Sequence, residues 1–338
     1  MGSMRKIKKR RKTKKRTSTL VLLFVIFELT FTAITGPFVL YYGPFKNVKS
    51  TVVGAAMTTY SLQWLATTFL SKESIAKIMS TQTVDALVQN NLDGVKVENK
   101  DDNSIERYDV KGHTYKGYIL IINDPTRLKV GFSSLIGKEG QLTSDIAKDN
   151  HAIAAINGGG FKDLDNGTKW VGTGANPTGI IMTNGKIIAN DITDVNKKTE
   201  LVAMTKSGKL LVGPHSLSEM KTDGVTDAVS FGPSLIVNGQ KTITKGDGGW
   251  GIAPRTCVAQ RKDGAIIFLV IDGRQLGMLG ATLKEAQDVL YDYGAYNATN
   301  LDGGSSSTLF YDDEVINSPS DSLGERSVPS IMYIESRK

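Results

Sequence analysis

The sequence predicts an α+β fold, with mixed, mainly antiparallel sheets and a few helices in one domain, preceded by an N-terminal transmembrane helix. Short apolar runs separated by Gly, Asn and Asp dominate the chain after residue 105, as is typical of strands. Asn-Gly and Asp-Gly pairs between several runs indicate tight hairpins, which join antiparallel strands. Near the N-terminus, the apolar stretch Leu20 to Tyr42 is long enough to cross a bilayer.

Residues 1–19 form a basic tail. Between residues 5 and 16 there are ten Lys or Arg and no acid, which more than accounts for the net charge of +7. The rest of the chain is slightly acidic, so we expect no nucleic-acid partner. Under the positive-inside rule, the tail predicts a cytoplasmic N-terminus and an extracytoplasmic location for everything after the anchor at 20–42. The expected location is therefore the cell membrane, with a single pass.

Two features leave this topology open. A cleavable signal peptide would also be apolar, but this stretch ends in bulky residues at 39–42 instead of small cleavage-site residues. A second uncharged stretch, Thr51 to Leu70, would form a membrane hairpin if it also spanned, and Lys72 and Lys77 after it suit that topology. Its threonines make it less apolar, which favours a helix lying against the membrane or on the domain.

Between the anchor and the main domain, residues 43–104 are predicted to form a helical stalk and linker. Ser71 precedes an early acid, Glu73, and the following apolar positions have partly helical spacing. From Asn90 the sequence becomes polar and charged, as in a loop. The main domain is then expected at 105–338.

Within the main domain, eight apolar runs predict strands. They are Gly117 to Ile122, Lys129 to Ser133, Ala152 to Ile156, Gly179 to Met182, Leu201 to Thr205, Ser234 to Val237, Ala265 to Ile271 and Ser330 to Ile334. Two helices are expected, at Leu142 to Asn150 and at Leu283 to Gly294. Thr282 and Glu285 fit a capping box before the second helix, which accounts for Glu285 without any chemical role.

Cysteine and histidine chemistry is not expected. One cysteine, Cys257, excludes an internal disulfide, and a buried structural thiol is the favoured interpretation. The three histidines, His113, His151 and His215, lie away from the motifs described below, so a histidine base or zinc site is not predicted. No cofactor is required by these patterns. Oxygen ligands leave Ca²⁺ or Mg²⁺ possible, although no EF-hand-like spacing occurs, and the metal requirement is unknown.

The run from Asn300 to Thr308 is the most informative motif. It places the carboxylate of Asp302 on a loop of residues too small to support a core. Gly303 and Gly304 allow a close backbone approach, and Ser307 and Thr308 supply hydroxyl hydrogen bonds. An isolated Asp-Gly-Gly-Ser is usually a turn. With the segments below, it predicts a pocket for an anion or a polyhydroxylated molecule.

Three further segments lie at the ends of predicted strands, where sites are usually built. Asn157-Gly158-Gly159 follows one strand, Pro254-Arg255-Thr256 precedes another, and Asp272-Gly273-Arg274 closes the most apolar run. Each alone would be interpreted as a turn or surface loop, and Arg274 as a surface charge. Trp250, in the glycine-rich stretch before Arg255, either stacks on a sugar ring or packs under its loop.

Together and in this order, with Asn317-Ser318-Pro319-Ser320 and Glu325-Arg326-Ser327-Val328-Pro329, these segments resemble the phosphodiester glycosidase family. This is the family of the lysosomal "uncovering enzyme", and the similarity extends over roughly residues 110 to 336. The family usually has three glycines and two serines after its aspartate. In this chain Ser305 replaces the third glycine, which adds a side chain where the backbone approaches a ligand.

The resemblance implies hydrolysis of a sugar joined through its anomeric carbon to a phosphate. It implies Asp302 and Asp272 as the catalytic carboxylates and Arg255 and Arg326 as the clamp on the phosphate, because a guanidinium pairs two phosphate oxygens. The remaining substrate-binding residues that it implies are Asn157, Gly158, Gly159, Trp250, Gly303, Gly304, Ser307, Thr308 and Asn317.

The expected substrate is a GlcNAc-1-phosphodiester-like linkage in an envelope glycopolymer such as teichoic acid or exopolysaccharide. Three alternatives remain. The chain could transfer a sugar or sugar phosphate during envelope biosynthesis, it could bind glycans without turnover, or it could be an interaction protein whose basic tail docks on anionic lipid. The serine at position 305 is the only sequence feature that supports glycan binding without turnover.

Overall fold

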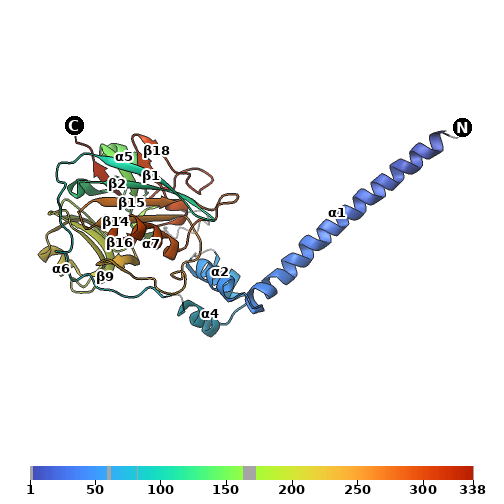
Figure 1. The fold of residues 1–338 in the computed structure, drawn as a ribbon, viewed down its shortest axis with the longest axis horizontal. Coiled ribbons are helices and arrows are strands. Elements are labelled where there is room, and N and C mark those ends of the chain that lie inside the picture. Colours follow the sequence, from blue (N-terminus) through green and yellow to red (C-terminus); the bar gives the residue numbers. More distant parts are fainter. Residues whose placement is uncertain (1–2, 59–61, 82, 163–172, 338) are drawn as a thin grey trace. The chain divides into compact units, whose positions relative to one another are not determined.

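In the computed structural model the chain forms two compact units, Met1–Met79 and Ser80–Lys338 (Figure 1). The structure describes residues 3–58, 62–81, 83–162 and 173–337, with side chains from residue 18 onward. Each unit has hydrophobic clusters of its own. One cluster lies within residues 40–79, and the other four lie entirely within residues 84–334. A fragment of residues 80–338 therefore retains every cluster of the second unit and is expected to fold independently.

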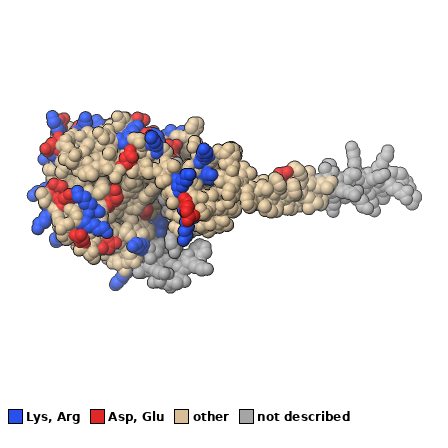
Figure 2. Space-filling view, turned by 90° about the horizontal axis from the view of Figure 1, so that it is seen from below, with Lys and Arg blue, Asp and Glu red and all other residues tan. Residues whose placement is uncertain are grey.

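The first unit is helical. Helix α1 (Ser3–Tyr42) contains the segment Ser18–Tyr42, whose mean hydropathy of 2.0 and length of 25 residues are sufficient to cross a membrane. Figure 2 shows almost no charged side chains along this part of the helix. The expected apolar N-terminal helix is confirmed.

The uncharged stretch Thr51 to Leu70 does not form one long helix. It contributes to α2 (Lys46–Thr58) and α3 (Trp64–Thr67), and residues 59–61 lie outside the described part. A spanning helix needs about 20 residues, and both helices are shorter. Together with α4 (Lys72–Met79), they bury Val53, Ala66 and Ile75 in a shared cluster. Among the described residues, α1 is the one helix that meets the length and hydropathy criteria for a span.

The second unit begins earlier than the expected start at residue 105. Residues 83–104 form neither helix nor strand, and part of this segment packs on the sheets. The buried side chain of Gln89 donates to the carbonyl of Leu210 and accepts from the N–H of Val212. This fixes the segment on the edge strand β10 (Leu210–His215) and covers backbone groups that would otherwise be open to another strand. A linker was expected because the segment is polar. One of its polar side chains, Gln89, instead forms hydrogen bonds with the main chain of edge strand β10.

Three main sheets form the unit, and every described strand pair is antiparallel, which confirms the predicted fold class. The seven-stranded sheet has the order β1 (Ile105–Lys111), β2 (Lys116–Ile122), β15 (Ile266–Ile271), β14 (Arg255–Arg261), β16 (Ala295–Asn300), β12 (Ser234–Val237) and β13 (Gln240–Lys241). The first five-stranded sheet has the order β10, β9 (Thr199–Thr205), β11 (Val225–Val229), β7 (Ile180–Thr183) and β8 (Lys186–Asn190). The second has the order β18 (Glu314–Val315), β17 (Leu309–Tyr311), β4 (Ala152–Asn157), β19 (Ser330–Glu335) and β3 (Leu128–Phe132), and β5 (Phe161–Lys162) pairs with β6 (Asn176–Pro177).

The sheets pack around one shared core, and each has a helix on its outer face (Figure 1). Helix α7 (Leu283–Asp292) covers the seven-stranded sheet, α6 (Leu217–Thr222) the β9 sheet and α5 (Thr143–Asp149) the β4 sheet. Strand β15 is therefore buried on both faces. Ile266, Phe268 and Val270 enter the shared core, and its alternate residues contact the α7 layer. This explains its continuous apolar run.

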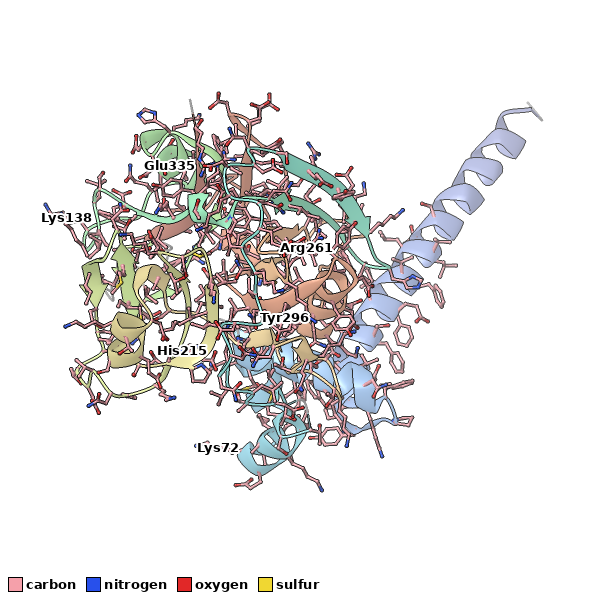
Figure 3. The ribbon with its side chains drawn as sticks, turned by 60° about the vertical axis from the view of Figure 1, so that its left-hand side comes forward. Lys72, Lys138, His215, Arg261, Tyr296 and Glu335 are labelled. Atoms are coloured by element: carbon pink, nitrogen blue, oxygen red, sulfur yellow. The ribbon has the colours of Figure 1, made fainter. Side chains whose placement is uncertain are left out.

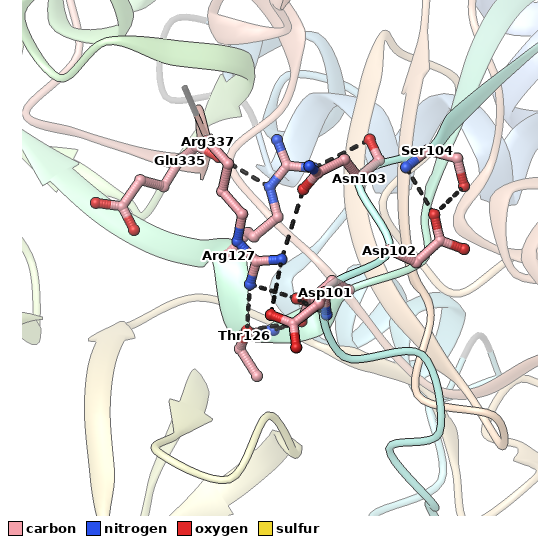
Figure 4. Close-up of polar contacts among 9 residues, drawn as sticks. Asp101, Asp102, Asn103, Ser104, Thr126, Arg127, Glu335 and Arg337 are labelled. Carbon is pink, nitrogen blue, oxygen red and sulfur yellow. Dashed lines mark hydrogen bonds and ion pairs between the residues drawn. The ribbon is translucent and has the colours of Figure 1, made fainter.

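The C-terminus is fastened to the start of the domain by a polar network (Figure 4). The buried guanidinium of Arg127 donates to the carbonyls of Glu335 and Asn103, and Arg337 pairs with the buried carboxylate of Asp124. A 3₁₀ turn, Pro125–Arg127, places these groups before β3. The network holds β19 at its end, so the opposite end of β19 has a fixed position beside the site.

All eight expected strands and both expected helices are present, with ends shifted by a residue or two. The Asn-Gly hairpins are also confirmed, since Asn184, Gly185, Asn238 and Gly239 all have positive φ between paired strands. Several strands were not predicted, among them β10 and β16. In β16 the buried positions are Asn297, Thr299, Asn300 and two alanines, so a run of large apolar residues is absent.

Candidate active site

The site is built where strands from two sheets end together. Strand β14 begins with Arg255, which lies opposite Ile271 at the end of β15, and Cys257 lies opposite Asn300 at the end of β16. Because neighbouring strands are antiparallel, the start of β14 and the ends of β15 and β16 lie on the same side of the seven-stranded sheet. Figure 3 labels Arg261 and Tyr296, which mark the opposite end of β14 and β16.

Asn157, at the end of β4, joins the second five-stranded sheet to this side. Its fully buried amide donates to the main-chain carbonyl of Asp302 over 2.6 Å. Its carbonyl oxygen accepts from the Thr256 hydroxyl at 2.7 Å and from the N–H of Thr308 at 3.2 Å. One side chain thus fixes both ends of the loop that carries Asp302.

Asp302 has the properties of a reactive carboxyl. It is partly exposed, yet the surrounding protein displaces enough water to raise the pKa of its carboxyl from 3.8 to about 6. Ser306, Arg326, the N–H of Gly303 and Arg274 oppose this rise by favouring the charged form of that carboxyl. The Ser306 hydroxyl approaches the carboxylate without the geometry of a full hydrogen bond. At neutral pH, Asp302 is therefore mostly ionised but readily protonated.

Two arginines flank this carboxylate. Arg274 donates from Nη1 to Oγ of Ser305 over 3.3 Å, and its backbone has a positive φ of 56°, which is uncommon for a residue other than glycine. Burial lowers the pKa of Arg274, and the nearby charge of Arg326 lowers it further. The guanidinium of Arg326 lies 4.8 Å from the ring centre of Phe161. Both guanidinium groups act on the charge of Asp302, and guanidinium groups suit an anionic ligand.

The loop after Asp302 contains unpaired buried hydroxyls. Its 3₁₀ turn, Gly304–Ser306, leads to Ser307 and Thr308, and the side chains of Ser306, Ser307 and Thr308 are at most 1% exposed. Among the described residues, their hydroxyl oxygens have no hydrogen-bond partner. Buried hydroxyls normally have one, so these groups are suited to bind a ligand or ordered water.

The glycines of this loop allow its backbone to pack closely against neighbouring residues. A Cβ on Gly303 would lie 2.9 Å from the carbonyl oxygen of Pro254. Gly304 has a φ of +64°, and a Cβ there would lie 3.1 Å from the Arg274 guanidinium. Ser305, which replaces the glycine usual at this place, accepts from Arg274 and so orients that arginine.

Asp272 is more enclosed than Asp302. It is 3% exposed, and its oxygens accept from Nδ2 of Asn317 and from the N–H of Ser318. Burial raises the pKa of the Asp272 carboxyl, and these hydrogen bonds oppose that shift. Asn317 also donates to the carbonyl of Ser307 and accepts from the N–H of Leu309. Asp272 is therefore linked to the hydroxyl-bearing loop through Asn317.

Comparison with known proteins identifies the family. The family model described as phosphodiester glycosidase matches residues 150–335, which is more than half of the chain. The chain belongs to the phosphodiester glycosidase family. Membership supports a glycosidase-type function for the site described above.

Solved structures with this fold come from several organisms. The catalytic domain of zebrafish N-acetylglucosamine-1-phosphodiester α-N-acetylglucosaminidase, auto-inhibited by its pro-peptide, is 21% identical with a TM-score of 0.60, covering 72% of this chain and 87% of that one. A hypothetical protein from Synechocystis is 16% identical with a TM-score of 0.51, covering 69% and 61%. An exported protein from Burkholderia pseudomallei K96243, described as putative, has the same identity and TM-score, covering 66% and 74%. At these identities the likeness shows the fold alone.

A curated relative matches over a shorter stretch. The SPbeta prophage-derived uncharacterized protein YomE of Bacillus subtilis (strain 168) is 36% identical over 81 residues. The match covers 24% of this chain and 12% of that protein, so the chain spans only a small part of the relative's length.

The sequence predicts Arg255 as part of a phosphate clamp, and the structure places its side chain among main-chain carbonyls. Its side chain is 3% exposed and donates to three main-chain carbonyls, those of Ala281, Trp250 and Gly251. Burial lowers the pKa of Arg255 to about 10. Nε and Nη2 of the guanidinium thus hold neighbouring loops together. Arg274, which the sequence suggested was a surface charge, is exposed, and it donates to Ser305 in the loop that follows Asp302.

Other groups that were expected to bind substrate also contact the protein itself. The N–H of Gly158 donates to the carbonyl of Ser330, and that of Gly159 donates to the Ser330 hydroxyl. A Cβ on Gly158 would lie 2.6 Å from Oγ of Ser330, so this glycine is needed for packing. Trp250 packs its ring edge against Phe231, with centroids 6.0 Å apart, which favours the packing interpretation of this residue.

Cys257 and Glu285 have the structural roles that the sequence predicts. Cys257 is fully buried, which raises the pKa of its thiol to about 12 and makes it inert at neutral pH. Thr282 and Glu285 form the capping box of α7. In the part of the chain that the structure describes, no group of three or more His, Cys, Asp and Glu is arranged to hold a metal ion. The sequence analysis did not assign Arg274 to the site. Its position directly after Asp272-Gly273, at the end of the most apolar strand, could have indicated that role.

Proposed function

We propose that this chain is a membrane-anchored, extracytoplasmic phosphodiester glycosidase that hydrolyses a sugar-1-phosphate diester in a cell-envelope glycopolymer and releases the free sugar. The observation that carries the proposal is Asp302, whose partly exposed carboxyl has a pKa raised to about 6 beside Arg274 and Arg326. A carboxylate next to two guanidinium groups meets the needs of a substrate that joins an anomeric carbon to an anionic phosphate.

In this proposal the arginines hold the phosphate and Asp302 faces the sugar. Asp302 attacks or stabilises the oxocarbenium-like anomeric carbon, or it activates water for the attack. The bond from that carbon to the phosphate oxygen breaks, and its electron pair leaves with the phosphate. Water supplies the oxygen of the free sugar and a proton for the phosphomonoester. Phosphate is a good leaving group, so a strong general acid is not required.

The remaining polar groups divide into binding and positioning roles. The unpaired hydroxyls of Ser307 and Thr308 are placed to contact sugar or phosphate. Asn157, Asn317 and Asp272 act through the loop, since their hydrogen bonds connect main-chain atoms on both sides of Asp302. Asp272, expected as a second catalytic carboxylate, is thus proposed as a positioning residue.

The anchor supports the envelope assignment. The segment Ser18–Tyr42 follows a basic tail, so the positive-inside rule predicts a cytoplasmic N-terminus and an extracytoplasmic second unit. A relative described as exported has the same fold. The proposed arrangement is a single pass at residues 20–42 and a catalytic domain at 105–338, with residues 80–104 belonging to the same compact unit as that domain. Teichoic acid and exopolysaccharide are the candidate polymers.

Release of free N-acetylglucosamine from an α-linked GlcNAc-1-phosphodiester by residues 80–338 tests the proposal. We expect release that is lost in Asp302→Asn and retained in Asp312→Asn. The latter is a matched control, because Asp312 is exposed at a turn with a φ of 53°, a conformation that Asn also adopts. A glycosylated acceptor in place of free sugar would indicate a transferase. Sugar binding without release would indicate a silent module.

A further inference from the structure

Two turns near the site each have a fully exposed leucine at the tip. The first turn is closed by a bridge between Gln275 and Met278 and has Leu276 at its tip, and the second is closed between Asp321 and Gly324 and has Leu323 at its tip. These leucines are 105% and 93% exposed, more than any other large apolar side chain in the described part of the chain. Leucine is a poor choice for a turn tip in water, where Gly, Asn, Asp and Ser are preferred.

Both turns project away from the body of the domain. Each leucine has a glycine beside it, Gly277 or Gly324, with a positive φ of 77° or 98°. A Cβ built on either glycine would have no atom within 4 Å outside its chain neighbours. The tips are therefore surrounded by open space, and no described part of the domain covers the leucines.

The two turns rise from the rim of the proposed active site. Arg274 directly precedes the first turn, and Arg326 follows the second by two residues. The charges of these arginines influence each other and that of Asp302. A hydrogen bond of 3.1 Å from Nε2 of Gln275 to the carbonyl of Ser318 joins the segments that lead into the two turns. Each turn thus has an apolar tip and an arginine near its base, and both arginines belong to one site. The acid beside the second arginine, Glu325, accepts from the N–H and the hydroxyl of Ser144.

We propose that Leu276 and Leu323 insert into the surface of a lipid bilayer and hold the active-site rim against it. A bilayer is the occupant that the chain itself indicates, because residues 18–42 form a helix able to cross one. The order of groups also matches a membrane surface, with leucines at acyl-chain depth and the arginines at the level of anionic phosphates. Asp321, the acid in the second turn, has its carboxylate turned to the N–H of Leu323. The inference does not depend on turnover.

Binding of residues 80–338 to vesicles of phosphatidylcholine and phosphatidylglycerol tests the inference, measured by co-sedimentation over a range of lipid concentrations. We expect Leu276→Ser and Leu323→Ser each to weaken partitioning by about tenfold, and the double variant to weaken it further. The matched control is Ile187→Ser, since Ile187 is a large apolar residue that is half exposed but lies on edge strand β8. Equal binding by the double variant, or an equal loss in the control, would overturn the proposal. Apolar insertion also predicts that part of the binding survives high salt.

The full chain gives an independent measurement. Leu276→Cys and Leu323→Cys can be labelled selectively with bimane, because the native Cys257 is fully buried and its thiol is protonated. In reconstituted vesicles we expect brominated lipids to quench both labels but not a label on Ile187→Cys. If the leucine-site labels are quenched no more than the control, the tips do not enter the bilayer, whatever the catalytic activity of the preparation.

Discussion

The side-chain amide of Asn157 donates a hydrogen bond to the main-chain carbonyl of Asp302 over 2.6 Å, linking residues 145 positions apart. One residue ends β4 and the other follows β16, so the bond joins two different sheets. The carboxyl of Asp302 is thereby held where both sheets end, and its environment is set by groups from both. The predictions below concern that environment.

Asp302 should lower stability at neutral pH. Burial raises the pKa of its carboxyl from 3.8 to about 6, so ionisation is harder in the folded than in the unfolded chain. Below pH 3.8 both states are protonated and no cost arises; the cost grows as pH rises and is complete above about 6. Asp302→Asn should therefore raise the free energy of unfolding by about 1–3 kcal/mol at neutral pH, the lower figure allowing for solvent screening.

Urea unfolding of residues 80–338 at neutral and acidic pH checks this sign. The gain from Asp302→Asn should disappear well below pH 3.8, where both proteins carry a neutral group at this position. Asp312→Asn, at an exposed turn, should show no such pH dependence. A variant less stable than the parent at neutral pH would contradict the assignment.

Removal of either flanking arginine should shift the pH profile upward. Arg274 and Arg326 both favour the charged form of Asp302, so Arg274→Ala or Arg326→Ala should raise the pKa of that carboxyl above about 6. The acid limb of kcat/KM would move to higher pH, and KM for the diester would increase by about 10- to 100-fold. The measurement is the pH dependence of sugar release. Arg107→Ala, which removes an exposed arginine on β1, should leave the profile in place.

Arg255 should contribute to stability more than to phosphate binding. Arg255→Met would leave the carbonyls of Ala281, Trp250 and Gly251 without their donor, which predicts a loss of about 2–5 kcal/mol in the free energy of unfolding. Arg261→Met is the control from the other end of β14, where a partly exposed ion pair should be worth less than about 1 kcal/mol. An unchanged unfolding curve together with a raised KM would instead restore the phosphate-clamp interpretation of Arg255.

Asp272 and Asn317 should act as one unit. Their hydrogen bond connects the end of β15 with the hydroxyl-bearing loop, so Asp272→Ala and Asn317→Ala should each lower kcat with little change in KM. A double-mutant cycle on kcat should give a coupling energy of about 1–3 kcal/mol, because either substitution alone disrupts the same contact. Additive effects would show that Asp272 acts independently of the loop, as a second catalytic carboxylate would.

The sequence by itself determined the local structure. The continuous apolar run at Ala265 to Ile271 requires burial on both faces, and the Thr282 and Glu285 pair specifies the start of α7. Asn184-Gly185 and Asn238-Gly239 adopt the positive φ angles of their hairpins through local backbone preference alone. The apolar helix and the loop of small residues after Asp302 were recognisable for the same reason, since composition within a short window decides them.

Only the tertiary structure decided the roles of the polar side chains. Arg255 and Arg274 each stand beside a strand end in the sequence, yet one is buried among main-chain carbonyls and the other flanks Asp302. Asn157 similarly has its amide occupied by partners 99 to 151 residues away. The role of an arginine or an amide depends on which acceptors and charges surround it after folding. Those partners come from distant strands, and no local pattern encodes them.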